Sequence, residues 1–112
     1  MDNQSPTVVD RPELERYELA VDGEVAILAY RRRDDRIILS HTEVPEAFRG
    51  RGVGGVLARH AFEEARRTGQ QVIVKCPFVT AWLKRHHEYD DLIIARIAGD
   101  GDANRQPPAA PK

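Results

Sequence analysis

The chain lacks several sequence features that are typical of common protein classes. One cysteine among 112 residues cannot form an internal disulfide, so we expect the reducing cytoplasm as its location. No apolar run approaches the length of a membrane span or the core of a signal peptide, which argues against a membrane partner. The formal net charge is −1, whereas nucleic-acid-binding domains are usually strongly basic, so no nucleic-acid partner is expected.

The composition is otherwise that of one small globular domain. Hydrophobic residues make up 41% of the chain, which suffices for one modest core. Residues 1–6 and 99–112 contain little that is bulky enough to bury, and the second segment is rich in glycine, proline and alanine. We therefore expect one domain over residues 7–98, between a disordered N-terminus and a disordered C-terminal tail.

Hydrophobic periodicity predicts a β-β-β-α-β-α order. Asp22-Gly23 is the signal of a two-residue hairpin, and Gly69 is the expected end of the first helix. Because that helix connects two strands, the crossover should be right-handed and the two strands parallel, which makes the sheet mixed. The predicted strands are 17–21, 25–30 with an extension toward 32, 37–44 and 71–75; the helices start at 52 and 77, and 92–97 is a possible final short strand.

The most informative segment is Arg49–Gly55, which has four glycines and two arginines between a strand and a helix. Glycine lets backbone N–H groups approach a ligand without a Cβ in the way, and the first turn of a helix has unpaired N–H groups and partial positive charge. With two guanidinium groups beside them, these N–H groups are suited to a phosphate or pyrophosphate. A plain glycine-rich turn is the alternative, but such a turn needs only one or two glycines.

The spacing of the glycines distinguishes between phosphate-binding motifs. Gly50, Gly52 and Gly55 satisfy G-x-G-x-x-G, but a dinucleotide-binding loop follows its strand directly and has an acidic residue about 20 positions on. Neither condition holds here. No Gly-Lys-Ser/Thr follows, so the loop is not a Walker motif. The pattern that remains is R-x-x-G-x-G, at Arg49, Gly52 and Gly54.

With its flanks, this pattern resembles the GNAT superfamily of acyl-CoA-dependent N-acetyltransferases, whose pyrophosphate-binding signature is Q/R-x-x-G-x-G/A. More narrowly, the chain is similar to a short, single-domain branch with H-T-E-V-P before the glycine run and C-P-F followed by a short helix after it. Here these blocks are His41–Pro45 and Cys76–Phe78. The resemblance covers residues 16–94 and departs at His87, where the branch commonly has proline.

The resemblance implies a minimal acyl-CoA N-acyltransferase fold of the α/β (α+β) class, with acetyl-CoA as co-substrate and no metal. It implies that the strands on either side of the long helix splay apart to admit the pantetheine arm, and that backbone N–H groups near Val44 bind the thioester carbonyl. The helices that longer relatives have between their first strands are missing here, so the acceptor site should be open. The pyrophosphate should lie on Arg49, Gly50, Arg51, Gly52, Val53 and Gly54.

Transfer to an amine needs a group that takes the proton of the amine. Side chains alternate along a strand, so His41 and Glu43 should share one face, about 7 Å apart. Ile37 and Leu39 should lie on that same face. Glu43 could act as the base, directly or through water, or His41 could act as the base or as an orienting partner. The structural alternatives are a half-buried histidine bonded to a neighbouring strand and a salt bridge from Glu43 to an arginine of the loop.

Cys76 ends the fourth strand and precedes a helix that starts at Pro77. A thiol at a helix N-terminus has a lowered pKa, and Cys76 should face the gap between the strands, opposite Glu43. It could accept the acetyl group in a relay before the amine does, or it could be a small buried residue where the strand meets the helix. Direct attack by the amine suffices in most of the superfamily.

We therefore predict an acetyl-CoA-binding N-acetyltransferase that moves an acetyl group to an unidentified primary amine by direct attack. The alternative is a CoA-binding module without efficient transfer, which is regulatory or part of a complex. The missing helices favour the module, whereas His41, Glu43 and Cys76 favour the enzyme. The oligomeric state stays open between a monomer and a homodimer.

Overall fold

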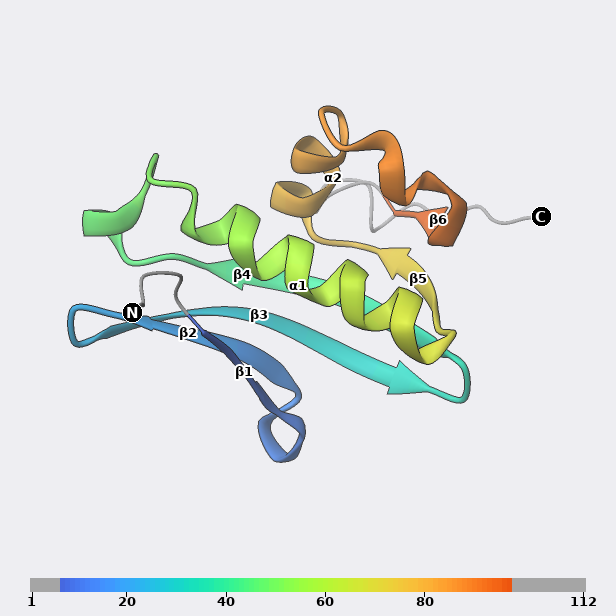
Figure 1. Cartoon of the computed structure of the whole chain (residues 1–112), viewed down its shortest axis with the longest axis horizontal. Coiled ribbons are helices and arrows are strands. Elements are labelled where there is room, and N and C mark those ends of the chain that lie inside the picture. The colour runs from blue at the N-terminus through green and yellow to red at the C-terminus, as the bar shows by residue number, and fades with distance from the viewer. Residues whose placement is uncertain (1–6, 98–112) are drawn as a thin grey trace.

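A six-stranded sheet forms the centre of the computed structural model, which describes residues 7–97 (Figure 1). The predicted disordered ends, 1–6 and 99–112, lie outside the described residues. The strands are β1 Val8–Arg11, β2 Arg16–Val21, β3 Glu24–Arg33, β4 Arg36–Glu43, β5 Gln71–Val74 and β6 Ile93–Arg96. The helices are α1 Val53–Thr68 and α2 Pro77–Leu83, with short 3-10 helices η1 Pro12–Leu14, η2 Glu46–Phe48 and η3 His87–Leu92.

The topology confirms the predicted mixed α/β fold. The strands lie side by side in chain order; β1 to β4 pair antiparallel, and β4, β5 and β6 pair parallel. Asp22 and Gly23 have positive φ angles of 50° and 83°, as a tight two-residue hairpin requires. Gly69 follows α1 in the left-handed conformation, with φ 76°. The possible final strand is present as β6.

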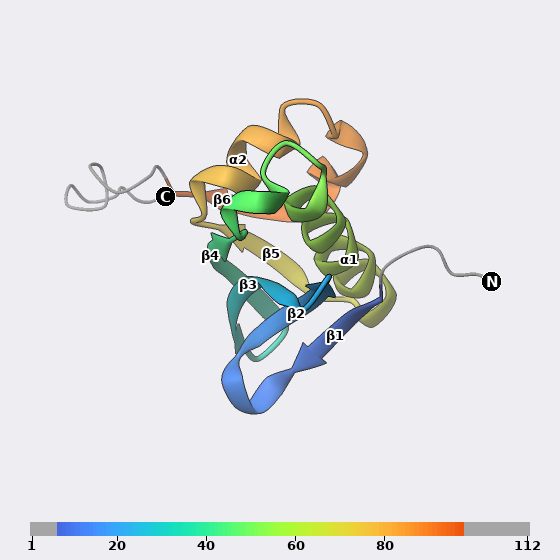
Figure 2. The same ribbon diagram turned by 90° about the vertical axis from the view of Figure 1, so that its left-hand side faces the viewer.

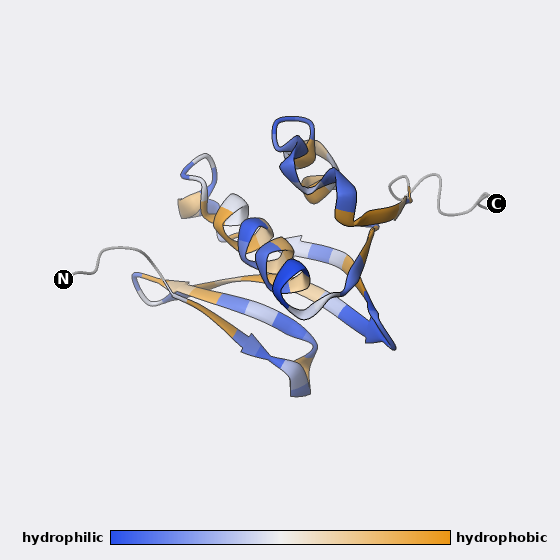
Figure 3. Cartoon of the chain, turned by 45° about the vertical axis from the view of Figure 1, so that its right-hand side comes forward, coloured by the Kyte–Doolittle hydropathy of each residue, from blue (hydrophilic) through white to orange (hydrophobic). Residues whose placement is uncertain are grey.

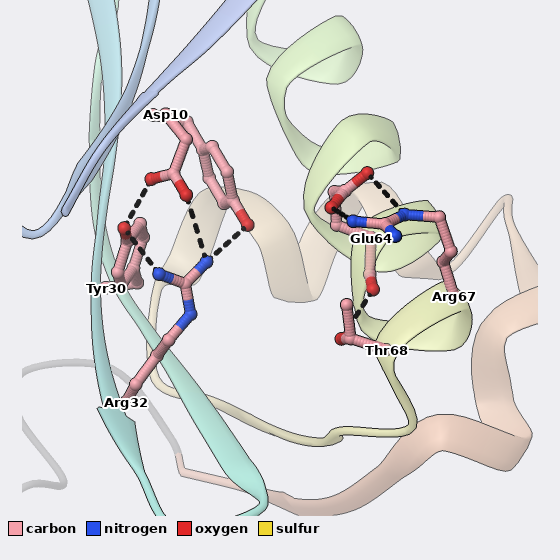
Figure 4. Close-up of polar contacts among 7 residues, drawn as sticks. Asp10, Tyr30, Arg32, Glu64, Arg67 and Thr68 are labelled. Carbon is pink, nitrogen blue, oxygen red and sulfur yellow. Dashed lines mark hydrogen bonds and ion pairs between the residues drawn. The ribbon is translucent and has the colours of Figure 1, made fainter.

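The first strand, β1, is absent from the sequence prediction. Of its four residues only Val8 is partly buried, so the strand has no alternating pattern to detect. Besides its antiparallel pairing with β2, polar side chains hold it on the sheet: Asp10 accepts hydrogen bonds from the hydroxyl of Tyr30 and from Arg32 (Figure 4). The guanidinium of Arg32 also donates to the hydroxyl of Tyr17 at 3.1 Å. These contacts join residues up to 22 positions apart, which local periodicity does not report.

Both α-helices cover the same face of the sheet (Figure 2). Right-handed crossovers that step in the same direction put their helices on one face, and β4-α1-β5 and β5-α2-β6 step in the same direction. The rings of Phe62 in α1 and Trp82 in α2 stack with centroids 6.2 Å apart. Hydrophobic and hydrophilic residues alternate along the strands (Figure 3). Within residues 7–97, neither α-helix covers the opposite face, which we call the open face.

A β-bulge in β4 decides which face its last residues occupy. Leu39 pairs with Tyr30 and His41 pairs with Ala29, so Ser40 is an extra residue in β4. Its hydroxyl donates to the carbonyl of Ala29 at 3.2 Å, a contact that stabilises the bulge. Beyond the bulge the alternation is reversed: Thr42 pairs with Leu28, a buried residue of the helix-covered face.

The prediction that Ile37, Leu39, His41 and Glu43 share one face is therefore wrong. Ile37 and Leu39 are buried under the helices, whereas His41 and Glu43 are exposed on the open face. The prediction failed because strict alternation holds only in a strand without a bulge. That His41 and Glu43 share a face is correct.

The strands β4 and β5 part after a short parallel segment. Their pairing runs from Arg36 with Gln71 to Leu39 with Val74. The N–H groups of Lys75 and Cys76 then both donate to the carbonyl of Leu39, at 2.9 and 3.1 Å, and the chain turns into α2. The four residues of β4 after Leu39 have no partner in β5. The gap that results lies at the same end of the sheet as the glycine run.

Candidate functional site

A groove of ≈ 1030 Å³ lies where the parted end of β4, the glycine run and the two α-helices meet. One wall comes from the end of β4 and from η2, the floor from the start of α1, and the other wall from α2 and the turn that follows it. The lining residues are Thr42, Val44, Phe48, Arg49, Gly50, Gly52, Val53, Gly54, Gly55, Val56, Arg59, Phe78, Trp82, Arg85 and His86.

The loop before α1 presents main chain rather than side chains to this groove. Gly50 and Gly52 are both in the left-handed conformation, with φ angles of 81° and 80°, and a Cβ at either position would project into open space. The first intrahelical bond of α1 goes from the N–H of Val56 to the carbonyl of Gly52 at 3.1 Å. The preceding N–H groups of α1 lack intrahelical partners, and its first turn contains no acidic residue. This arrangement favours an anion.

The next two glycines have a different role from the one that the sequence suggested. A Cβ on Gly55 would lie 2.9 Å from Nε1 of Trp82, which is 8% exposed and stacks on His86. A Cβ on Gly54 would lie 2.7 Å from the ring of Phe78, which is 41% exposed. These two glycines let α2 approach α1 closely. Only Gly50 and Gly52 are required by the backbone of the loop.

Positive charge lines the groove from both helices. Arg49 comes from the loop, Arg59 from the second turn of α1, and Arg85 from the turn after α2. Arg59 is positioned by the hydroxyl of Tyr89, which accepts its Nη1–H at 2.9 Å. Arg51 does not line the groove; its guanidinium lies 5.3 Å from the centre of the Phe48 ring.

The sequence prediction missed Arg59 and Arg85. Gly55 and Arg59 are four residues apart and therefore share one helical face. That spacing was the available signal. Arg85 enters the groove only because α2 packs against α1, and no local pattern reports that contact.

His41 and Glu43 form a pair on the open face, outside the lining of the groove. Nε2 of His41 lies 2.9 Å from Oε2 of Glu43, within hydrogen-bond distance. Their side chains are 58% and 68% exposed, so both reach solvent. Val44, the next residue, lines the groove on the other side of the strand end. The end of β4 therefore separates the pair from the groove.

Cys76 lies behind the wall of the groove. Its side chain is 1% exposed, and Sγ lies 3.0 Å from Oγ1 of Thr42. Thr42 itself lines the groove. The thiol thus contacts Thr42 rather than Glu43 across the gap between β4 and α2. The structure brings Cys76 to the parted strands, and the hydroxyl of Thr42 stands between it and the groove.

Tyr89 is held away from the groove. Its hydroxyl donates to Oε2 of Glu63 in α1 at 2.5 Å and accepts from Arg59. Its ring is 1% exposed and stacks on Phe62, with centroids 5.1 Å apart. Burial, with the hydrogen bond to Glu63, raises the pKa of this hydroxyl above its ordinary value of 10.0. Tyr89 therefore reaches the site only indirectly, through Arg59 and through Trp82, on which its ring stacks at 5.9 Å.

Residues 7–97 contain neither a candidate membrane-spanning helix nor a candidate metal site. No helix in this part of the chain has both the length and the apolar character to cross a membrane. No three or more histidine, cysteine, aspartate or glutamate side chains of these residues cluster in a way that could hold a metal ion.

Comparison with known proteins identifies the family. The sequence profile of the family described as GCN5-related N-acetyl-transferase matches residues 16–92. A bovine relative, Protein NATD1 of Bos taurus, is 36% identical over 62 residues, which are 54% of this chain and 55% of that protein, so the chain spans about half of its length. A GCN5-like protein of Staphylococcus aureus, solved by NMR, superposes with a TM-score of 0.62 at 26% identity, over 85% of this chain and 92% of the other. The chain belongs to the GCN5-related N-acetyltransferase family.

Proposed function

We propose that this protein binds acetyl-CoA in the groove and transfers the acetyl group to a primary amine by direct attack. The observation that carries the proposal is the groove itself, which runs from unpaired main-chain N–H groups at the start of α1 to the parted end of β4 and β5. The end of the groove at α1 suits a diphosphate, and the other end opens into the gap between β4 and β5. Membership of the family makes an acyl-CoA the expected ligand.

The residues of the groove fit such a ligand part by part. The N–H groups of Gly50, Gly52, Val53 and Gly54 are available to a diphosphate, with Arg49, Arg59 and Arg85 as counter-charges. The N–H groups of Arg49 and Arg51, which the sequence prediction included, instead donate to the carbonyls of Glu46 and Phe48 at 3.2 and 3.1 Å. Apolar side chains, including Val44, Phe48 and Phe78, line the path between the loop and the strand end. The groove is thus charged at one end and apolar along the rest, which matches a ligand with phosphates at one end and the narrow pantetheine arm at the other.

In the proposed transfer reaction, the two sides of the end of β4 have different roles. Acetyl-CoA, when bound, supplies an acetyl group that is activated as a thioester. On the groove side, the backbone N–H of Val44 would donate to the carbonyl oxygen while the C–N bond forms. The C–S bond then breaks, and CoA leaves as a thiolate that takes a proton from solvent. On the open face, Glu43 takes the proton of the amine, directly or through water, and His41 orients it through their 2.9 Å contact. The amine therefore approaches from the open face while the thioester enters from the helix-covered face.

A CoA-binding module without efficient transfer is the second candidate. The exposure of His41 and Glu43 favours it, because an acceptor amine at this position would lie outside the groove, beside two side chains that are 58% and 68% exposed. Such a module would bind CoA through the same groove. The two candidates thus differ in what happens on the open face.

Calorimetry followed by a transfer assay tests the proposal. CoA and acetyl-CoA are titrated into the full chain, and the loss of thioester is then followed with a panel of primary amines. We expect both nucleotides to bind and at least one amine to accelerate thioester loss. Binding without amine-dependent loss would favour the module, and absence of binding would overturn both candidates.

A further inference from the structure

The open face has three arginines that lie together and form no ion pair within residues 7–97, although Asp34 and Asp35 form the turn between two of them. Arg31 and Arg33 alternate along β3, and Arg36 begins β4 beside them. All three are exposed. The other arginine of β3, Arg32, is paired with Asp10 at 3.3 Å, and Arg16 of the neighbouring strand β2 is paired with Glu18 at 2.8 Å. We call Arg31, Arg33 and Arg36 the arginine patch.

The backbone holds this patch in an unfavourable arrangement. Arg33 and Arg36 are direct cross-strand partners in the β3–β4 ladder. Like charges directly opposite each other in a sheet are destabilising, because their Cβ atoms are only about 5 Å apart. An anion between the two guanidinium groups would remove that repulsion. A carboxylate should therefore bind more strongly between Arg33 and Arg36 than beside an isolated surface arginine.

The patch and the His41–Glu43 pair occupy the same face. Arg31 pairs with Ile38, three positions before His41 in β4, and Arg36 lies five positions before His41. At about 3.3 Å per residue, the far end of the patch is roughly 16 Å from the pair. A small amine does not span that distance. An acceptor that uses both features is therefore an extended chain of several residues.

The surface between the two features is apolar and only partly buried. Ala29, Ile38 and Ile73 lie there as neighbours on β3, β4 and β5. A peptide that lies along β4 would cover these side chains with its own. No covering helix obstructs this path within the described residues (Figure 2).

We propose that the acceptor is an acidic peptide segment. Its primary amine lies at His41 and Glu43, and carboxylates three to five positions away lie on the arginine patch. This inference rests on the proposed transfer function and names the class of its acceptor. A nucleic acid is disfavoured because its phosphates would continue from the patch to Glu43 on the same face, where the peptide has an amine instead.

The test compares matched peptides as acceptors. One heptapeptide with a free N-terminus has aspartates at positions 4 to 6, a second has serines there, and a parallel pair presents the amine on a lysine. Transfer is measured as kcat/KM at low ionic strength. Surface ion pairs are individually weak, so three of them should favour the acidic peptide by roughly tenfold, and added salt should reduce this preference.

Substitutions in the arginine patch test whether the patch causes the preference for the acidic peptide. In the triple variant Arg31→Gln, Arg33→Gln, Arg36→Gln we expect kcat/KM for the acidic peptide to fall to the value for the serine peptide. The kcat/KM for the serine peptide should stay unchanged. Arg67→Gln on α1 is the matched control, because Arg67 is exposed and paired with Glu64 on the other face. Folding is checked by thermal unfolding; removing like charges from exposed positions should not lower the melting temperature.

Four outcomes would overturn the inference, and they differ in what they refute. Equal kcat/KM for the acidic and serine peptides, or an acidic preference that survives the triple substitution, refutes the acceptor class while transfer itself stands. Tighter binding of a single-stranded oligonucleotide through the same arginines refutes it in favour of a nucleic acid. No thioester loss with any peptide or small amine refutes the transfer function on which the inference rests.

Discussion

The hydroxyl oxygen of Thr42 lies 3.0 Å from the sulfur of Cys76, across the gap between β4 and the start of α2. Thr42 faces the gap because the bulge at Ser40 reverses the alternation of β4. The contact therefore joins the two elements that part to form the site. It also separates the thiol from the groove, which bears directly on whether the acetyl group passes through Cys76.

Substitution of Cys76 distinguishes direct attack from a cysteine relay. We expect Cys76→Ala and Cys76→Ser to retain amine-dependent transfer within a few-fold of wild type, because the thiol is buried behind Thr42. Cys76→Ala should lower the free energy of unfolding by about 1 kcal/mol, since it removes buried volume and one hydrogen bond. Transfer is followed by loss of thioester absorbance. Loss of transfer in both variants with intact acetyl-CoA binding, or an acetylated Cys76 found by mass spectrometry as a kinetic intermediate, would establish the relay.

Glu43 and His41 should contribute unequally to the rate. Glu43→Gln removes the proposed base and should lower kcat by about 100-fold. His41→Gln removes only the orienting partner and should lower kcat by roughly tenfold. Because neither residue lines the groove, the affinity for CoA should stay unchanged in both variants. Glu24→Gln, an exposed carboxylate at the start of β3 that is not part of the pair, is the control. A larger loss from His41→Gln would make histidine the base, and no loss from either would remove the pair from the mechanism.

Two left-handed glycines at opposite ends of α1 form a matched test of the loop. Gly52→Ala and Gly69→Ala should each cost about 1–2 kcal/mol in stability, because both positions have positive φ and an open surround. Only Gly52 lines the groove, so only Gly52→Ala should also weaken CoA binding, by tenfold or more. Urea unfolding and calorimetry measure the two effects. Equal affinities in the two variants would show that the loop does not contact the nucleotide.

Gly54 and Gly55 should respond differently to the same added methyl group. Gly55→Ala should destabilise by about 1–3 kcal/mol, because Trp82 is buried in a stack and cannot move aside. Gly54→Ala should be close to neutral, since the Phe78 ring is 41% exposed and can turn away. Chemical denaturation of the two variants checks this order. A reversed order would mean that close approach of α2 is limited at Phe78 instead.

Stability should fall at alkaline pH through the tyrosines. Burial raises the pKa of Tyr17, Tyr30 and Tyr89 in the folded protein, and the hydrogen bonds of Tyr30 to Asp10 and of Tyr89 to Glu63 add to this. Because each pKa is raised above the unfolded value near 10, their stabilisation is complete below that pH and is lost as the pH rises through the folded values. Tyrosinate absorbance should therefore appear only with unfolding. Ionisation near pH 10 in a protein that is still folded would contradict this.

The features of the fold that depend on local pattern could be predicted from the sequence. The hairpin at Asp22-Gly23, the helix that ends before Gly69 and the parallel strands that it joins each have a signal within a few residues. The loop geometry of Gly50 and Gly52 also follows from glycine content, because only glycine adopts these φ angles without strain.

The features that depend on contacts between distant segments could not be predicted. The bulge at Ser40 is stabilised by a carbonyl of β3, and it moved His41 and Glu43 to the face opposite to Leu39. The requirement for Gly55 comes from Trp82 in another helix. Arg85 reaches the groove only through the packing of α2 on α1. Each of these needs the assembled fold.

The central claim is that main-chain amides at the start of α1 bind the diphosphate of CoA, and NMR titration tests it most directly. On addition of CoA to ¹⁵N-labelled protein, we expect the amide resonances of residues 49–55 to shift most, with those of Gly69 and Gln70 at the far end of α1 unchanged. Saturating CoA that leaves residues 49–55 unmoved would contradict the account and both of its candidate functions.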